Sequence, residues 1–166
     1  FFWAFCDDYL ELVKERAYSE AGPGQVSAVV ALRTALATLL RLFAPVVPFA
    51  TEESWSWFNE GSVHHAAWPT ASELTGDWDD VSAVLSFASQ ALTGIRRAKT
   101  DAKASQKTLV DLAVVAGPDD AIAALRLAAD DLKAVGRIAD LRLESDDALV
   151  VTDILLAPVP QTEESR

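Results

Sequence analysis

Methionine is absent from these 166 residues, and cysteine occurs only once. A single cysteine excludes an internal disulfide, and the place of Cys6 in an apolar helical pattern predicts a buried, reduced thiol, as expected in the cytoplasm. Glycine and proline number only seven each, which excludes a fibrous or low-complexity chain. A chain of this length can form one compact body with a subdomain without covalent cross-links.

A long uninterrupted hydrophobic run is also missing. The most apolar stretch, 26–50, contains Arg33, Arg41 and two prolines, so it predicts a core helix and no membrane partner. Signal and transit patterns are absent as well. The opening run FFWAFCDDYLELVKERAY already follows a helical pattern and has no start methionine. We therefore expect an internal piece of a longer cytoplasmic polypeptide.

Positive charge is scarce: 14 basic residues stand against 25 acidic ones, for a formal net charge of -11. This balance excludes general adhesion to nucleic acid, since phosphate binding needs a positive surface, and any RNA contact must be local. The acidic excess concentrates after Pro118, whereas the first half and residues 96–107 hold most of the cations.

Catalytic patterns are missing too. The sequence has no glycine-rich phosphate loop and no cysteine or histidine pair at metal spacing, and the adjacent His64 and His65 should point apart. A nucleophilic Cys6 would need an electropositive, partly exposed setting, which an apolar helix face does not supply. We expect no catalytic site, cofactor or metal in this chain.

The first half follows a helical period. Apolar spacing predicts a helix over 1–18, a loop over 19–25 and an antiparallel second helix that ends before Pro45. We expect Thr51 to cap a third helix and Trp68 to anchor the following segment through a buried indole. A fourth helix should begin at Asp77 or Asp79 and reach at least Lys99.

The second half changes character after Lys107. TLVDLAVVAG predicts a strand, residues 118–136 a helix, and RIADLRLES and ALVVTDILLA two strands joined by a hairpin turn at Asp146 and Asp147. The predicted fold class is α+β, mainly α. An antiparallel helical bundle over 1–107 precedes a small β-α-β-β subdomain over 108–157, and 158–166 is a flexible tail.

Three segments occur in a distinctive order: FCDDYLELVKERAY, LRLFAPVVPFATEESWSWF and SVHHAAWP. Together they resemble the anticodon-binding domain of class I aminoacyl-tRNA synthetases of the valine, isoleucine and leucine group, most closely the valyl enzymes. The resemblance covers residues 1 to about 69, continues loosely through IRRAKTDAKASQKTL, and is only topological after Lys107.

The resemblance implies a helical-bundle domain that binds the anticodon stem-loop of tRNA(Val). It also implies a parent that joins valine to this tRNA with ATP and Mg, in catalytic and editing domains that would be the other partners of this chain. Two alternatives stay open: the same domain of an isoleucyl or leucyl enzyme, or a protein-interaction module whose acidic β-α-β-β unit docks a protein and whose RNA binding is negligible.

Two regions are candidates for RNA contact. On a helical wheel, one stripe of the first helix combines an aromatic ring, a carboxylate, an apolar side chain and a cation, which can hold an unstacked base. A second stripe, on the fourth helix if it persists, is cationic and can track phosphates. The first consists of Trp3, Asp7, Leu10 and Lys14, and the second of Arg96, Lys99, Lys103 and Lys107.

Each candidate has a plainer alternative. The first stripe could instead pack on a neighbouring domain, and the second could be a solvated helix end, where cations suit the helix dipole. Arg41 lies with Thr34 and Thr38 on the polar side of the second helix. It could contact the sugar-phosphate backbone or be an ordinary solvated arginine.

Overall fold

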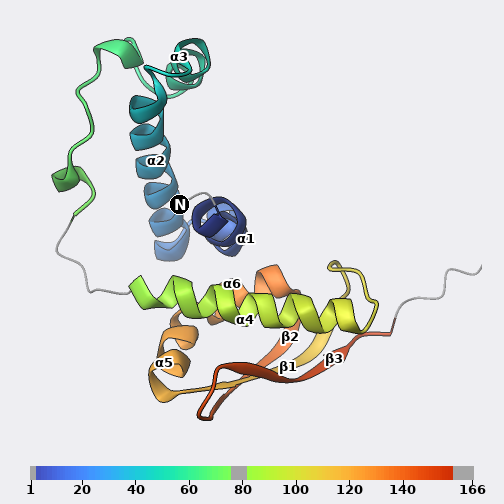
Figure 1. The fold of residues 1–166 in the computed structure, drawn as a ribbon. Helices are drawn as coiled ribbons and strands as arrows, with labels where there is room; N and C mark the ends of the chain where they lie inside the picture. Colours follow the sequence, from blue (N-terminus) through green and yellow to red (C-terminus); the bar gives the residue numbers. More distant parts are fainter. Residues whose placement is uncertain (1–2, 76–81, 159–166) are drawn as a thin grey trace, which may run out of the picture. The chain divides into compact units, whose positions relative to one another are not determined.

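The computed structural model of the chain describes residues 3–75 and 82–158. Two compact units are present: an α/β unit formed by Phe1–Arg16 with Asp80–Arg166, and a helical unit formed by Ala17–Asp79 (Figure 1). The described residues contain six α-helices and one three-stranded sheet. The predicted class, α+β and mainly α, is confirmed.

The first helical segment has two parts. Residues Trp3–Tyr9 form a π-helix, which continues as α1, Leu10–Tyr18. The rings of Phe5 and Tyr9 stack with centroids 5.6 Å apart. Leu12 and Val13 are buried, and Leu12 belongs to the main core of the α/β unit. The apolar face predicted for this segment is therefore packed within that unit.

The helical unit consists of two helices and a connecting strap. Helix α2 spans Pro23–Phe43 and α3 spans Pro48–Ser56, and each begins with a proline, a residue whose fixed φ suits a first helical turn. Short 3₁₀ turns follow at Val63–His65 and Ala71–Glu73. The core of this unit is small: Leu40, Ala44 and Val63 are buried, with Trp55 and Phe58 packed against them.

Two predictions for this unit are wrong. Thr51 does not cap α3, because the helix begins three residues earlier at Pro48 and Thr51 lies buried in its first turn. The Thr51 hydroxyl donates to the carbonyl oxygens of Val47 at 3.0 Å and Pro48 at 3.1 Å. Trp68 is 60% exposed, so its indole is not a buried anchor within this unit.

The α/β unit is a sheet covered by helices. Helix α4 is Ser82–Asp101, α5 is Asp119–Leu127 and α6 is Ala129–Gly136. The strands are β1, Val110–Gly117, β2, Ile138–Ser145, and β3, Val150–Leu156. Their order is β2-β1-β3, with β2 parallel and β3 antiparallel to β1. The three helices pack against the sheet face that carries Val110, Ala113 and Val115 (Figure 1).

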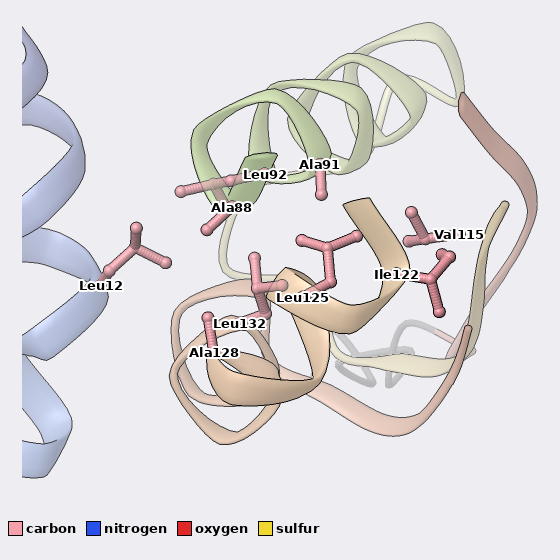
Figure 2. Packing of buried hydrophobic residues seen from close by; sticks show 9 residues of the cluster. All are labelled: Leu12, Ala88, Ala91, Leu92, Val115, Ile122, Leu125, Ala128 and Leu132. Atoms are coloured by element: carbon pink, nitrogen blue, oxygen red, sulfur yellow. The ribbon is translucent and has the colours of Figure 1, made fainter. Parts of the chain in front are cut away.

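Figure 2 shows the main core of this unit, where small residues of α4 meet branched side chains of α5, α6 and β1. The close approach of α4 to β3 depends on Gly94, because a Cβ atom there would lie 2.7 Å from Val151 Cγ2. The nine buried residues of the cluster are Leu12, Ala88, Ala91, Leu92, Val115, Ile122, Leu125, Ala128 and Leu132.

The predicted hairpin between the last two strands is wrong, because β1 lies between β2 and β3. The chain leaving β2 crosses the end of β1 instead: the amide of Asp146 donates to the carbonyl of Gly117 at 2.8 Å. A Cβ atom on Gly117 would come within 2.9 Å of Leu149 Cδ1, so glycine allows this crossing. The helix predicted over 118–136 divides into α5 and α6 at Ala128.

Several predictions stay open. The boundary at Lys107 is one of them, although α4 and the first helical segment up to Arg16 belong to the same compact unit as the sheet. The antiparallel pairing of the first two helices is another. The caps at Asp77 or Asp79 and most of the tail 158–166 lie outside the described residues. Helix α2 is long and apolar enough to span a membrane by length and composition, a weak criterion that core helices also meet.

Candidate nucleic-acid interface

The stripe predicted on the first helical segment is accessible. Trp3 is 74% exposed, Asp7 and Lys14 are exposed, and Leu10 is half-buried. Lys14 Nζ lies 3.6 Å from Glu11 Oε1. Since residues 3–9 are π-helical, with i→i+5 hydrogen bonds, a wheel drawn at the α-helical period does not place Trp3 and Asp7 in line with Lys14. The four side chains share a segment rather than one straight row.

Lys99 is not available to RNA, which corrects its place in the cationic stripe. Its side chain is 1% exposed, and its Nζ donates to the carbonyl oxygens of Gly136 at 2.8 Å, Thr108 at 2.9 Å and Gln106 at 3.1 Å. Burial lowers the pKa of this ammonium from its usual value, and the positive charge of Arg137 lowers it further. Lys99 therefore connects α4 to the following loop and to the end of α6 by hydrogen bonds.

The remaining cations of that stripe do not form a helical ridge. Helix α4 ends at Asp101, and Lys103 follows with a left-handed backbone at φ 54°. The amide of Ala104 then donates to the carbonyl of Lys99 at 2.9 Å, which closes the helix end. Lys103 and Lys107 are exposed on the loop, and Arg96 is half-buried on the last turns of α4.

Arg137, which the predicted stripes do not include, stands beside this loop, and Lys133 lines a neighbouring hollow together with Arg137, Glu15 and Asp111. Lys133 is in α6, and Arg137 follows the helix with a φ of 54°. Arg137 Nη1 donates to the carbonyl of Lys107 at 3.0 Å. Their spacing of four residues near a helix end was a signal of one shared cationic face, but only the fold brings Arg137 beside residues 96–107.

Arg41 is engaged within the helical unit. Its Nη2 lies 2.6 Å from Glu73 Oε2, Nη1 donates to the carbonyl of Ala67 at 3.3 Å, and Nε donates to the carbonyl of Ala37 at 3.2 Å. The hydrogen bond from Arg41, helped by one from the amide of Thr70, lowers the pKa of Glu73 to about 2. Arg41 therefore ties the connecting strap to α2, beside a groove of about 570 Å³.

Metal and nucleophile chemistry find little support in the described part of the chain. No group of three or more potential ligands there could hold a metal ion. His64 Nε2 lies 3.9 Å from Glu52 Oε2, whose oxygen also accepts from the amide of Val63 at 3.0 Å. Cys6 is half-buried. The thiol of Cys6 is therefore less buried than the sequence predicted.

Comparison with known proteins decides the family. A family model described as the anticodon-binding domain of tRNA ligase matches residues 1–114. The chain belongs to this family. This anticodon-binding domain is 63% identical over 163 residues to a valine–tRNA ligase of Leifsonia xyli, covering 98% of the chain and 19% of that relative.

Further valine–tRNA ligases are similar to this chain over nearly its whole length. That of Salinispora tropica is 47% identical over 174 residues, covering 94% of the chain and 20% of the relative, and that of Thermobifida fusca is 47% identical over 164 residues, covering 95% and 18%. The predicted resemblance to valyl enzymes is confirmed. The anticodon-binding domain spans about a fifth of the length of these curated relatives.

The family match also bears on where the interface lies. Residues 1–114 include the first helical segment and the cations from Arg96 to Lys107. Arg137 lies beyond the match, yet it bonds to that cationic loop at Lys107 in the same compact unit. The α/β unit of the anticodon-binding domain therefore carries the exposed Trp3 and most of the clustered cations, while further exposed aromatic side chains, such as Phe49 and Trp57, belong to the helical unit.

Proposed function

We propose that this chain is the part of a cytoplasmic valine–tRNA ligase that holds the anticodon stem-loop of tRNA(Val). The reaction that uses ATP, Mg and valine would take place in domains outside this sequence. The observation that carries the proposal is the family match over residues 1–114 together with valine–tRNA ligase relatives that cover nearly the whole chain. The role of this domain is binding and orientation, which positions the distant acceptor end.

The surface of the α/β unit supports this role. An exposed indole at Trp3 offers a face for an unstacked base, and the neighbouring Asp7 carboxylate can accept from a base amino or imino group. Lys14 and the loop cations Lys103 and Lys107 supply local positive charge on a chain whose average charge repels RNA.

The surface of the helical unit is consistent with contacts to other domains of the same polypeptide. Helix α2 buries only two of its residues, Ala28 and Leu40. Large apolar side chains remain exposed along it, and an apolar surface of this kind commonly marks an interaction site. We assign the exposed apolar surface of α2 to contact with the catalytic and editing domains of the ligase. The exposed side chains are Val26, Val30, Leu36, Leu42 and Phe43.

The test is tRNA binding by the complete ligase, measured across a salt series. We expect tRNA(Val) to bind more tightly than a tRNA(Val) whose anticodon has been exchanged. Trp3→Ala should weaken the binding of both tRNAs, since stacking of a base on an aromatic ring is worth about 1–3 kcal/mol and tolerates any base. Lys14→Gln should weaken the binding of both tRNAs. It should also reduce the magnitude of the slope of log K against log salt by about 0.7–0.9, the value for one phosphate contact.

A matched control is Arg126→Gln, which removes one exposed charge from α5, outside both candidate stripes. This variant should bind as the unmodified ligase does. An unmodified ligase with equal affinity for the two tRNAs would contradict the proposal and favour a protein-interaction role. Tighter binding of an isoleucine or leucine tRNA would reassign the domain within the group.

A further inference from the structure

A basic hollow lies where three segments of the α/β unit meet: the last turns of α4, the loop 102–109 and the junction between α6 and β2. Its volume is about 240 Å³. Four of the side chains that line it are basic and one, Glu11, is acidic, so the lining has a formal charge of +3 in a chain of -11. The four basic residues are Arg96, Lys99, Lys107 and Arg137.

The walls of this hollow are held in place by hydrogen bonds. The buried Lys99 ammonium bonds both to the loop, at Gln106 and Thr108, and to the end of α6, at Gly136. Arg137 Nη1 bonds to the carbonyl of Lys107, and Gln106 Nε2 donates to the carbonyl of Arg96 at 3.0 Å. The cations are therefore presented by a fixed frame, which reduces the entropy lost on binding.

The charge of this frame is not neutralised within the described residues. There, no carboxylate oxygen lies within 4.0 Å of the basic nitrogens of Arg96, Lys107 or Arg137, nor of the nearby Lys103 and Lys133. Among the other described basic residues, five have such a partner, whereas Arg33 and Arg126, which belong to α2 and α5 and do not line the hollow, do not. The paired ones are Lys14, Arg16, Arg41, Arg97 and Arg142.

We propose that this hollow binds a phosphate group of the tRNA backbone, with Arg137, Lys107 and Arg96 as the contacting side chains and the buried Lys99 ammonium as its positive floor. The inference rests on the proposed function and adds the α6–β2 junction to the RNA-binding surface. Glu11 borders the hollow, and its partner Lys14 lies one turn further along α1. The hollow and the aromatic first segment can therefore serve one RNA.

The charge of Arg137 is tested by two variants of the complete ligase. Arg137→Lys and Arg137→Gln both lose the guanidinium bond to Lys107, but only the second loses the charge. We expect Arg137→Gln to lower the salt slope of tRNA(Val) binding by about 0.7–0.9. Arg137→Lys should keep most of that slope. Lys107→Gln should match Arg137→Gln, and Arg126→Gln should behave as the unmodified ligase.

Anticodon preference separates this inference from the proposed function. Phosphate contacts carry no sequence information, so Arg137→Gln should weaken tRNA(Val) and its anticodon-exchanged form equally. An unmodified ligase that prefers tRNA(Val), with Arg137→Gln and Lys107→Gln indistinguishable from Arg126→Gln, would overturn the phosphate site and leave the function intact. An unmodified ligase that binds tRNA(Val) and its anticodon-exchanged form equally well would instead overturn the proposed function.

Inorganic phosphate distinguishes the two sources of the ligand. We expect it to compete with tRNA(Val) at the hollow, so that Arg137→Gln reduces both inorganic phosphate competition and tRNA affinity. A variant that loses inorganic phosphate binding while its tRNA affinity is unchanged would assign the hollow to a free anion and overturn its role in RNA binding. Thermal unfolding of each variant checks that the fold is retained.

Discussion

Lys99 is the clearest case of a single residue with a structural task. Its ammonium has three protein acceptors, which matches its three N–H donors. A buried carbonyl that loses its partner costs about 1–3 kcal/mol. The bonds reach across 7, 9 and 37 residues of sequence, so one side chain connects α4, the loop and the α6–β2 junction.

Replacing Lys99 should therefore destabilise the α/β unit. Lys99→Met keeps most of the length of the side chain but removes the donor of all three bonds. Because only the bond to Gly136 is fully buried and water can reach the carbonyls of Gln106 and Thr108, we expect a loss of about 1–3 kcal/mol in the free energy of unfolding. Urea unfolding measures the change. Lys103→Met is the matched control, since Lys103 is exposed and a surface change of this kind stays within about 0.5 kcal/mol. Equal stability of the two variants would show that the hydrogen bonds contribute little.

The burial of Lys99 had a signal in the sequence. It continues the apolar row Ala88, Leu92 and Ile95 at helical spacing, and all three are buried. The same spacing also places Lys99 near Arg96 and Lys103, and the cationic interpretation followed that second pattern. Periodicity alone could not choose between them, because the deciding acceptors include Gly136, 37 residues away.

Among the connecting elements, the strap over residues 66–75 is held to α2 by an ion pair and hydrogen bonds. Arg41 of α2 bonds to both ends of it, at Ala67 and Glu73. Glu73 also completes a capping box, since its side chain accepts from the amide of Thr70 at 2.9 Å. A short segment with few buried residues is thus held to a helix mainly by one guanidinium.

The contribution of the Arg41–Glu73 ion pair to stability should depend on pH. The pKa of Glu73 is lowered from 4.5 to about 2, so the folded state binds fewer protons at this group than the unfolded state between these values. Its contribution to stability is complete above about pH 4.5 and is lost as the pH falls towards about 2. NMR titration of the Glu73 carboxyl should show a midpoint near 2, and Arg41→Gln should raise it towards 4.5. An unchanged midpoint in Arg41→Gln would show that the pair does not form.

At the same scale, local pattern predicted the elements but not their partners. The four helices of the first hundred residues and the three strands were expected close to where they lie, because burial imposes periods of 3.6 and 2 on the sequence. The place of β3 was not foreseen. A two-residue acidic turn suggests a hairpin between β2 and β3. Instead the chain passes the end of β1 beside Gly117, and β3 then pairs with β1. Such a choice of partner depends on packing between distant segments.

Across the whole molecule, charge is divided unevenly. The sheet face opposite the helices carries acidic side chains from both edge strands, Asp140 and Glu144 from β2 and Asp153 from β3, all exposed. Most of the described cations that lack a carboxylate partner lie instead on the last turns of α4, the 102–109 loop and the α6–β2 junction of the same unit, while Arg33 and Arg126 lie elsewhere. Under the proposed function, this arrangement favours phosphate contact at one edge of the α/β unit, since electrostatic attraction to phosphate does not depend on sequence.

Reversing charge on the acidic face should therefore reduce discrimination between tRNAs. In the complete ligase, Glu144→Lys with Asp153→Lys offers phosphates a second positive surface, so we expect the affinity for an unrelated tRNA to rise more than that for tRNA(Val). The measurement is the ratio of the two dissociation constants at fixed low salt, and it should approach one. Glu144→Gln with Asp153→Asn, which only removes charge, should give an intermediate ratio. A ratio that stays constant through this series would show that the acidic face has no part in confining RNA to the cationic edge.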